Sequence, residues 1–314
     1  MDIDPRPERT WLRAAALLVL TLGLAVVSSG VLVAVPFLVF ATFLGARRFP
    51  TVMASVLAVM VTLGAAARGG VWYLERGWTV ILAGWFVVLT LRWPESRFFP
   101  RALGAVSGTF GLVSLLLALQ PGSWSKVDWF VTEGIMKSVS LAMNLVAAWR
   151  PESEISAAVV NTAFETAAQQ GRLFPALLGL SSLAGLGVAW WGYVRLSTGS
   201  DQGLGPLKDF RFNDHCVWFL LVGIALIVLG LGDAWTRAGT NTVVFMGGLY
   251  AIRGVAVVLF FNGGISLFGF LAVALGMLVL APVLILGALI IGVGDTWLDL
   301  RAKAEVPGSG ATDS

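Results

Sequence analysis

The sequence has few charged residues: Asp, Glu, Lys and Arg make up only 12% of its 314 residues. Soluble domains carry about 25%, so the composition indicates a membrane protein. There is one cysteine, Cys216, and one histidine, His215. They exclude a disulfide within the chain and a cysteine-based metal cluster, and they argue against a histidine-rich metal site or a histidine-based catalytic triad. We expect no metal and no cofactor.

Motifs of the common enzyme classes are also missing. The sequence contains no P-loop, G-x-S-x-G, H-E-x-x-H or C-x-x-C, and no G-x-G-x-x-G that follows a strand and opens a helix. The net charge is only +3, and the basic residues are scattered among loops, unlike a nucleic-acid-binding footprint. We expect a protein that is not an enzyme and binds no nucleic acid.

The sequence is rich in long apolar runs, with 57% hydrophobic residues and a mean hydropathy of +0.85. A bilayer core about 30 Å thick needs roughly 20 apolar residues per helix. We therefore predict an all-α polytopic bundle, one domain over residues 1–314, in the bacterial inner (cytoplasmic) membrane. The predicted spans are 12–28, 31–46, 51–68, 78–93, 101–119, 173–195, 215–232, 240–262 and 265–292. Residues 302–314 are predicted to be a flexible tail.

The number and orientation of the spans depend on the N-terminal region. Only "SSG" separates the first two runs, so they form either two spans or one bent helix, which gives nine spans or eight. The same region has some features of a signal peptide, but further spans follow and favour an uncleaved first span. Basic residues such as Arg92, Arg97 and Arg101 favour a cytoplasmic N-terminus. Nine spans then place the tail outside, and eight place it inside.

Residues 121–171 are neither a span nor a simple loop. Charges are too frequent for a span, yet apolar residues recur at helical spacing: Ile135, Val139, Ala142, Leu145, Val146 and Trp149. Arg150-Pro151 breaks this helix, and "PESE" starts another with acidic residues in its first turn. We predict two amphipathic helices that lie at the membrane surface or cap the bundle. This insertion is where lipid or a protein partner would bind.

Arg253 is the clearest polar residue inside a predicted span. A charge at that depth is costly and normally faces the bundle interior or a water-filled cavity. One interpretation is a clamp for a solute anion, in a cavity that Tyr250, Asn241 and Asn262 could also line. The other is a structural ion pair with Asp233 or Asp295. The spacing of small residues in "GAVSG" and "ALIIG" predicts close helix packing near Gly104, Gly108, Ala288 and Gly292.

Further acidic residues lie near predicted span ends. Asp295 and Asp299 are four residues apart, so they share one helix face. They are either solvated at a span end or part of a site for a coupling ion or proton. Asn213 or Asp214 could cap the helix that follows. A metal or acid–base pair of Asp214 with His215 is disfavoured, because adjacent helical residues do not share a face.

Four segments together resemble a known family. They are "FPALLGL" from 174, "LKDFRFNDHCVWFLLVGIAL" at 207–226, "LYAIRGVAVVLFF" at 249–261 and "GVGDTWLDLR" at 292–301. In this order they resemble the YybS-like family of predicted bacterial membrane proteins, a domain of unknown function. The matching positions are Phe210, Arg211, Phe212, Arg253, Gly254, Asp295 and Arg301. The chain departs from the family at Asn213, where proline is frequent.

The resemblance implies a solute-related function. The YybS-like family is thought to be remotely similar to the substrate-binding membrane subunits of energy-coupling-factor vitamin transporters. Those subunits hold a small solute in a helical bundle and work with separate ATPase and coupling subunits. We therefore expect a small-solute-binding or transport subunit, powered by a partner or an ion gradient. The alternative is a non-transporting scaffold or assembly protein that docks a partner through 121–171.

Overall fold

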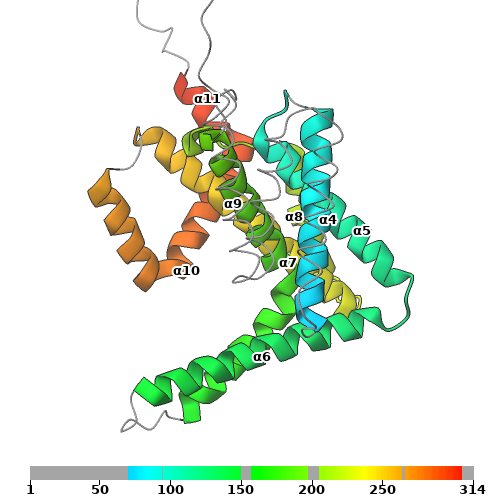
Figure 1. The fold of residues 1–314 in the computed structure, drawn as a ribbon. Coiled ribbons are helices and arrows are strands. Elements are labelled where there is room, and N and C mark those ends of the chain that lie inside the picture. The colour runs from blue at the N-terminus through cyan, green and yellow to red at the C-terminus, as the bar shows by residue number, and fades with distance from the viewer. Residues whose placement is uncertain (1–69, 94, 150–156, 197–204, 264–265, 306–314) are drawn as a thin grey trace, which may run out of the picture. The chain divides into compact units, whose positions relative to one another are not determined.

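The computed structural model describes residues 70–93, 95–149, 157–196, 205–263 and 266–305, and the regular structure there is helical (Figure 1). The prediction of an all-α fold is confirmed for these residues. The predicted spans 12–28, 31–46 and 51–68 lie outside them, so the choice between eight and nine spans stays a prediction. The contacts divide the chain into two compact units, one up to Leu204 and one from Gly205, where the sequence suggested a single domain.

The first unit contains α4 (Gly70–Arg92), α5 (Phe98–Ala118), α6 (Ser123–Trp149) and α7 (Ala157–Leu196). Helix α5 is long and apolar enough to cross a membrane, as predicted for 101–119. Helix α4 packs on α5 at Gly108, which has no side chain. A Cβ added at this glycine would lie 3.0 Å from the Trp85 ring of α4. The "GAVSG" spacing therefore serves close packing, as predicted.

The core of the first unit joins α4, α5 and α7. Trp78 donates a buried hydrogen bond of 2.9 Å from Nε1 to Ser182 Oγ. The same indole meets the ring of Phe110 edge to face, with ring centroids 4.6 Å apart. A buried indole N–H needs a partner, so this hydrogen bond fixes α4 against α7.

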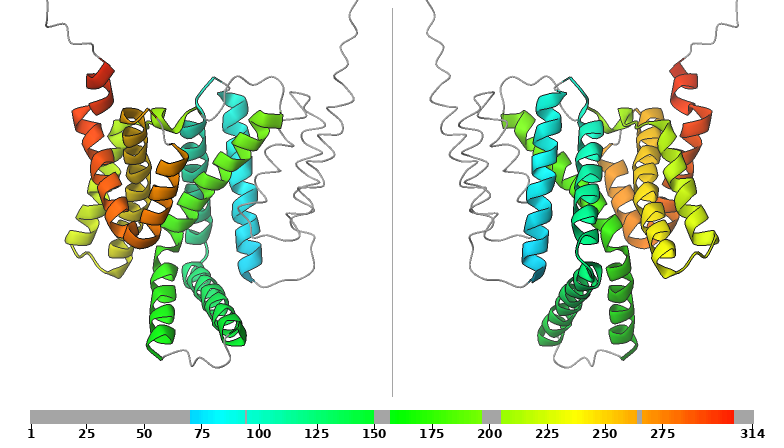
Figure 2. Two further views of the ribbon diagram at one scale, coloured as in Figure 1. Left: turned by 90° about the vertical axis from the view of Figure 1, so that its left-hand side faces the viewer. Right: turned by 90° about the vertical axis from the view of Figure 1, so that its right-hand side faces the viewer.

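Helices α6 and α7 form a hairpin in which they pack side by side (Figure 2). Helix α6 ends at Trp149, just before the predicted break; the "PESE" start lies outside the described residues. Helix α7 then runs for 40 residues with Pro175 inside it. One continuous helix therefore runs across the predicted boundary between the insertion and span 173–195, and the boundary itself stays a prediction. Gly171, at that boundary, is buried and lies against Thr132 of α6, so helix packing continues across it.

The second unit begins with two short turns, η1 (Leu207–Asp209) and η2 (Asp214–Cys216), and helix α8 (Val217–Val228). Helix α8 has 12 residues, about 18 Å of helix, and is shorter than the predicted span 215–232. It ends because Gly230 and Gly232 adopt positive φ angles of 58° and 113°, a conformation that glycine adopts easily and that stops a helix. Alone, α8 is too short to cross a bilayer core about 30 Å thick.

Helix α9 (Asp233–Phe261) is span-length and apolar, and it begins seven residues before the predicted 240–262. Polar side chains in its first turns find hydrogen-bond partners within the helix; for example, Thr240 Oγ1 donates to the Thr236 carbonyl at 2.8 Å. Helix α8 packs closely on α9: a Cβ at Gly239 would lie 2.7 Å from the carbonyl oxygen of Gly223.

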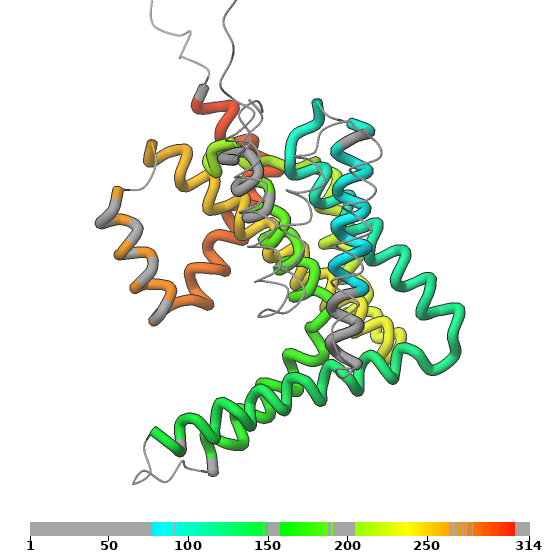
Figure 3. Tube along the Cα trace, in the orientation of Figure 1, coloured from blue at the N-terminus to red at the C-terminus, as the bar shows by residue number. Residues whose placement is uncertain are grey.

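Helix α10 (Leu267–Leu298) is bent at Leu280, whose φ of −122° and ψ of 24° are not helical. Pro282 explains the break, because proline has no N–H to donate and its ring clashes with the preceding turn. The chain reverses direction at this point (Figure 3). Only Val279–Leu298 has span length, and it extends beyond the predicted limit at residue 292. The first half, from Leu267, is about 20 Å long.

The second half of α10 crosses α9 at two glycines. A Cβ at Gly254 would overlap the carbonyl oxygen of Ala288, and a Cβ at Gly292 would overlap that of Tyr250. The predicted packing role of Ala288 and Gly292 is confirmed. Short helix α11 (Leu300–Glu305) follows, so residues 302–305 of the predicted tail are helical. This close crossing brings Arg253 of α9 next to Asp295 of α10.

Candidate functional site

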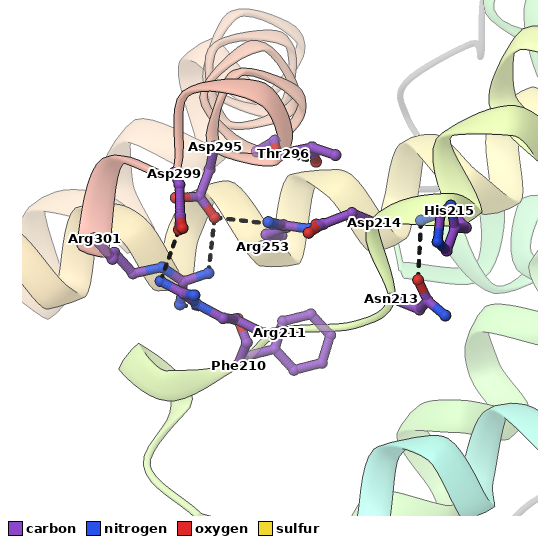
Figure 4. A network of polar contacts seen from close by, with 11 residues as sticks. Phe210, Arg211, Asn213, Asp214, His215, Arg253, Asp295, Thr296, Asp299 and Arg301 are labelled. Carbon is purple, nitrogen blue, oxygen red and sulfur yellow. Dashed lines mark hydrogen bonds and ion pairs between the residues drawn. The ribbon is translucent and has the colours of Figure 1, made fainter. Parts of the chain in front are cut away.

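Arg253 is paired with two carboxylates (Figure 4). Its Nε donates to Asp295 Oδ2 at 2.9 Å, and its Nη1 donates to Asp214 Oδ1 at 2.6 Å. The arginine side chain is only 2% exposed, whereas that of Asp214 is 62% exposed. Arg253 therefore joins a fully buried acid on α10 to an exposed acid at the start of α8.

Asp295 is shared between two arginines. Its Oδ2 also accepts a hydrogen bond of 2.8 Å from Arg301 Nη2. Asp295 and Arg301 are 1% and 2% exposed. Two opposite charges in an apolar region are tolerable when each is paired and hydrogen-bonded. The predicted solvated span end at Asp295 is therefore wrong: helix α10 continues past it, and α11 covers it.

Arg301 also holds the segment that precedes α8, residues 206–216, which we call the strap. Its Nη1 donates to the carbonyl oxygens of Lys208 and Phe210, at 3.0 and 3.1 Å. The turn at Asp299, with a left-handed φ of 44°, redirects the chain so that Arg301 follows in α11. An outer ion pair of 3.3 Å joins Arg211 to Asp299, both of which are partly exposed.

Aromatic rings support the buried cation. The guanidinium of Arg253 lies 5.4 Å from the centroid of the Phe212 ring, within the range of a cation–π contact. Phe212 in turn meets Tyr250 edge to face at 5.0 Å and Phe210 at 6.0 Å. The "FRF" sequence of the strap thus places two rings beside the network and Arg211 at its outer edge.

The network is balanced in charge and closes one end of the second unit. Arg211, Arg253 and Arg301 face Asp214, Asp295 and Asp299. Two buried atoms, Asp295 Oδ1 and Arg301 Nε, have no hydrogen-bond partner among the described residues. Chemically, the arrangement ties α9, α10, α11 and the strap together, and each arginine already faces a carboxylate.

The structure brings only some of the predicted site residues together. Tyr250 is fully buried beside the network. Asn241 donates to the Arg237 carbonyl within its own helix, and exposed Asn262 donates to the Val258 carbonyl at the end of α9. Both lie away from Arg253 along α9, so of the three residues only Tyr250 lies beside the arginine, and a shared cavity stays a prediction.

The two predicted ion-pair partners are also separated. Asp295 contacts Arg253, whereas Asp233 is exposed at the first position of α9, about 30 Å along the helix from the arginine. Sequence reasoning missed Asp214 as a partner and considered it a helix cap. Asn213 supplies that cap: its Oδ1 accepts a hydrogen bond of 3.0 Å from the backbone N–H of His215. This leaves the Asp214 carboxylate available for Arg253.

These observations define a class of protein. Within the described ranges, three apolar helical segments have span length: Phe98–Ala118, Asp233–Phe261 and Val279–Leu298. Together with a paired buried arginine, they describe a multi-pass membrane protein. Residues 13–296 match a family described as predicted membrane protein (DUF2232). The chain belongs to this family, which confirms the expectation of a predicted membrane protein of unknown function. No curated protein and no solved structure matches the chain.

Proposed function

We propose that the protein is a small-solute-binding or transport subunit with its solute site in the second unit. The observation that carries this proposal is a pair of apolar helical segments that are too short to cross a bilayer: α8 and the first half of α10. Broken backbone at membrane depth is tolerated where it is buried in protein or lines a water-filled cavity. In secondary transporters, short or Pro-interrupted segments mark the solute site.

Arg253 has a different role in this proposal from the predicted solute clamp. Its charge is already matched by Asp295 and Asp214, so a solute anion would have to compete with two carboxylates. In this proposal, Arg253 has a structural role: it binds the strap, through Asp214, to α10, through Asp295. Protonation of Asp295 would weaken its ion pairs with the two buried arginines, so Asp295 remains the candidate coupling residue. Asp233 and Asp299 are exposed, which makes them weaker candidates.

The YybS-like resemblance supports the same proposal. A remote similarity to substrate-binding subunits of energy-coupling-factor transporters fits a protein that binds solute and has no ATP-binding motif of its own in the sequence. A partner ATPase or an ion gradient would supply the energy.

The proposal is tested by thermal unfolding of the purified protein in detergent against vitamins, nucleobases, amino acids and small anions. A ligand at 100 times its Kd stabilises a protein by about 2.7 kcal/mol. We expect a stabilising solute whose effect is lost in Pro282→Ala, which restores the N–H at the break in α10, and kept in Asn262→Ala at the exposed end of α9. A screen in which no solute stabilises the protein would overturn the proposal.

A second candidate, a scaffold or assembly protein, is favoured by one observation on α6. Its residues Leu141, Leu145 and Trp149 are 62%, 55% and 87% exposed. They follow one another at intervals of four, so they form one apolar stripe. The opposite side of α6, with Met136 and Met143, is half-buried. Exposed apolar patches mark contacts with proteins or membranes.

The scaffold hypothesis has its own test. Leu145→Glu should remove a co-purifying protein if the stripe docks a partner, and Ser140→Glu, on another side of the same helix, should not. If Leu145→Glu retains every co-purifying protein and the screen finds a solute, the scaffold hypothesis is rejected in favour of the solute-binding subunit.

A further inference from the structure

A second buried arginine, Arg101, lies in the first unit. The sequence groups it with loop residues that set orientation, but the structure places it in the first turn of α5, where it is only 4% exposed. A charged residue inside a membrane segment is expected to be paired or to serve a binding function. Arg101 therefore needs a partner of negative charge.

The described residues do not provide that partner. Nε of Arg101 donates a long hydrogen bond of 3.4 Å to the carbonyl oxygen of Arg97, and Nη2 has no hydrogen-bond partner among the described residues. No carboxylate of the described ranges forms an ion pair with it. Arg253 differs from Arg101 in this respect: it is buried to a similar degree, but it forms ion pairs with two carboxylates.

The position of Arg101 on its helix makes the missing negative charge more evident. The N-terminus of a helix carries partial positive charge, which disfavours a cation and favours an anion. The residue before α5, Arg97, makes no side-chain capping bond. A buried guanidinium and an uncapped helix N-terminus thus bring two positive features to one place, and both suit an anion.

Aromatic side chains surround the guanidinium. It lies 4.6 Å from the centroid of the Trp190 ring. Phe98 stacks on Trp190 with centroids 6.3 Å apart, and Phe86 meets Trp190 at 6.0 Å. Phe86 and Trp190 are 1% and 6% exposed. This wall excludes water, which strengthens any charge–charge interaction there, and it suits a ligand with an apolar body next to its charged group.

We infer that Arg101, the N-terminus of α5 and the Phe86–Phe98–Trp190 wall bind an oxyanion, a carboxylate or phosphate group, carried by an otherwise apolar molecule. The inference goes beyond the proposed function, because this site lies in the first unit and the proposed solute site lies in the second. Arg is the residue that binds carboxylate and phosphate through two parallel N–H donors, and Arg101 has an unused Nη2 for this purpose.

The test uses the full-length protein, purified in detergent and freed of lipid. Thermal unfolding is measured with inorganic phosphate, with benzoate, and in nanodiscs of phosphatidylcholine with or without phosphatidylglycerol. We expect at least one of these anions to raise the Tm of the wild type. Arg101→Gln should lose the response, and Arg97→Gln, one turn away on the exposed surface, should keep it. The arms distinguish a free oxyanion from the headgroup of an anionic lipid.

A further readout separates binding from a merely structural role. Without anion, Arg101→Gln should be at least as stable as the wild type, because it removes a buried charge that has no described partner. If Arg101→Gln does not fold, Arg101→Lys decides: it keeps the charge but lacks the guanidinium fork, so a weakened response supports the site and an undiminished response rejects it.

The outcome is independent of the solute screen. An Arg101-dependent response to phosphate or benzoate, with no solute whose effect is lost in Pro282→Ala, keeps the anion site and overturns the transport proposal. A solute whose effect is unchanged in Arg101→Gln, with no response to any anion, overturns the anion site and keeps the proposed function.

Discussion

A single oxygen atom of Asp295 accepts hydrogen bonds from two arginines, Arg253 at 2.9 Å and Arg301 at 2.8 Å. The two arginines reach it from different helices, α9 and α11. One buried carboxylate therefore fixes the positions of three helices and, through Arg301, of the strap. The predictions that follow use this dependence.

Arg253→Ala should destabilise the protein strongly. It leaves Asp295 buried with one arginine fewer, and breaking a buried ion pair by removing one partner costs roughly 3–5 kcal/mol. The measurement is thermal unfolding in detergent. Arg253→Lys keeps a charge but not both donors, so it should fall between alanine and the wild type. An alanine variant as stable as the wild type would show that the pair does not hold the unit together.

The two acids that pair with Arg253 should differ in their importance. Asp295→Asn leaves two buried arginines without their shared charge and should cost several times more than Asp214→Asn. Asp214 is 62% exposed, and an exposed ion pair contributes about 0–1 kcal/mol. Unfolding of the two variants under identical conditions checks the order. Equal losses, or a larger loss for Asp214→Asn, would contradict the structure of the network.

Gly254→Ala should be disruptive although alanine favours helices. The added methyl group would overlap the carbonyl oxygen of Ala288, a backbone atom that cannot move alone. Gly287→Ala is the matched control on α10, because nothing lies within 4 Å of a Cβ there. The control should be neutral or stabilising by up to about 1 kcal/mol. Unfolding temperatures that do not separate the two variants would place the helix crossing elsewhere.

The chain end and the strap should lie on the same side of the membrane. Arg301 contacts the strap directly, and α10 reverses before it ends. The basic residues at this end of the unit are Lys208, Arg211, Arg301 and Lys303. Near the start of α9, at the other end, the described residues include only one basic residue, Arg237. Cytoplasmic loops carry such an excess, so we expect this end in the cytoplasm.

Reporter fusions check this topology. A fluorescent protein should fluoresce when it is fused after Glu305, and also when it is inserted after Gly205, at the start of the strap. Alkaline phosphatase that is active at either position would place that segment outside the cytoplasm and contradict the arrangement. The result also decides the side of the tail, which span counting alone left dependent on eight or nine spans.

Composition and periodicity predicted the helical membrane fold, because they depend on local properties of the chain. The pairing of Arg253 with Asp295 was one of two predicted alternatives, since a buried arginine needs an acid and few acids lie in apolar segments. Asp214 could not be recognised, because its contact depends on a strap that another arginine holds in place. Pro282 marks the break in α10 in the sequence, but the length of α7, which continues through Pro175, depends on packing between helices that no local pattern reports.

The order of synthesis gives the Arg253 network a consequence for biogenesis. The chain is made from its N-terminus, so when α9 enters the bilayer only Asp214 of its two counter-ions exists. Asp295 follows 42 residues after Arg253. Until Asp295 has been synthesised, Asp214 is the only one of the two acids that can pair with Arg253. The buried counter-ion of Arg253 is therefore made only after α9 itself is complete.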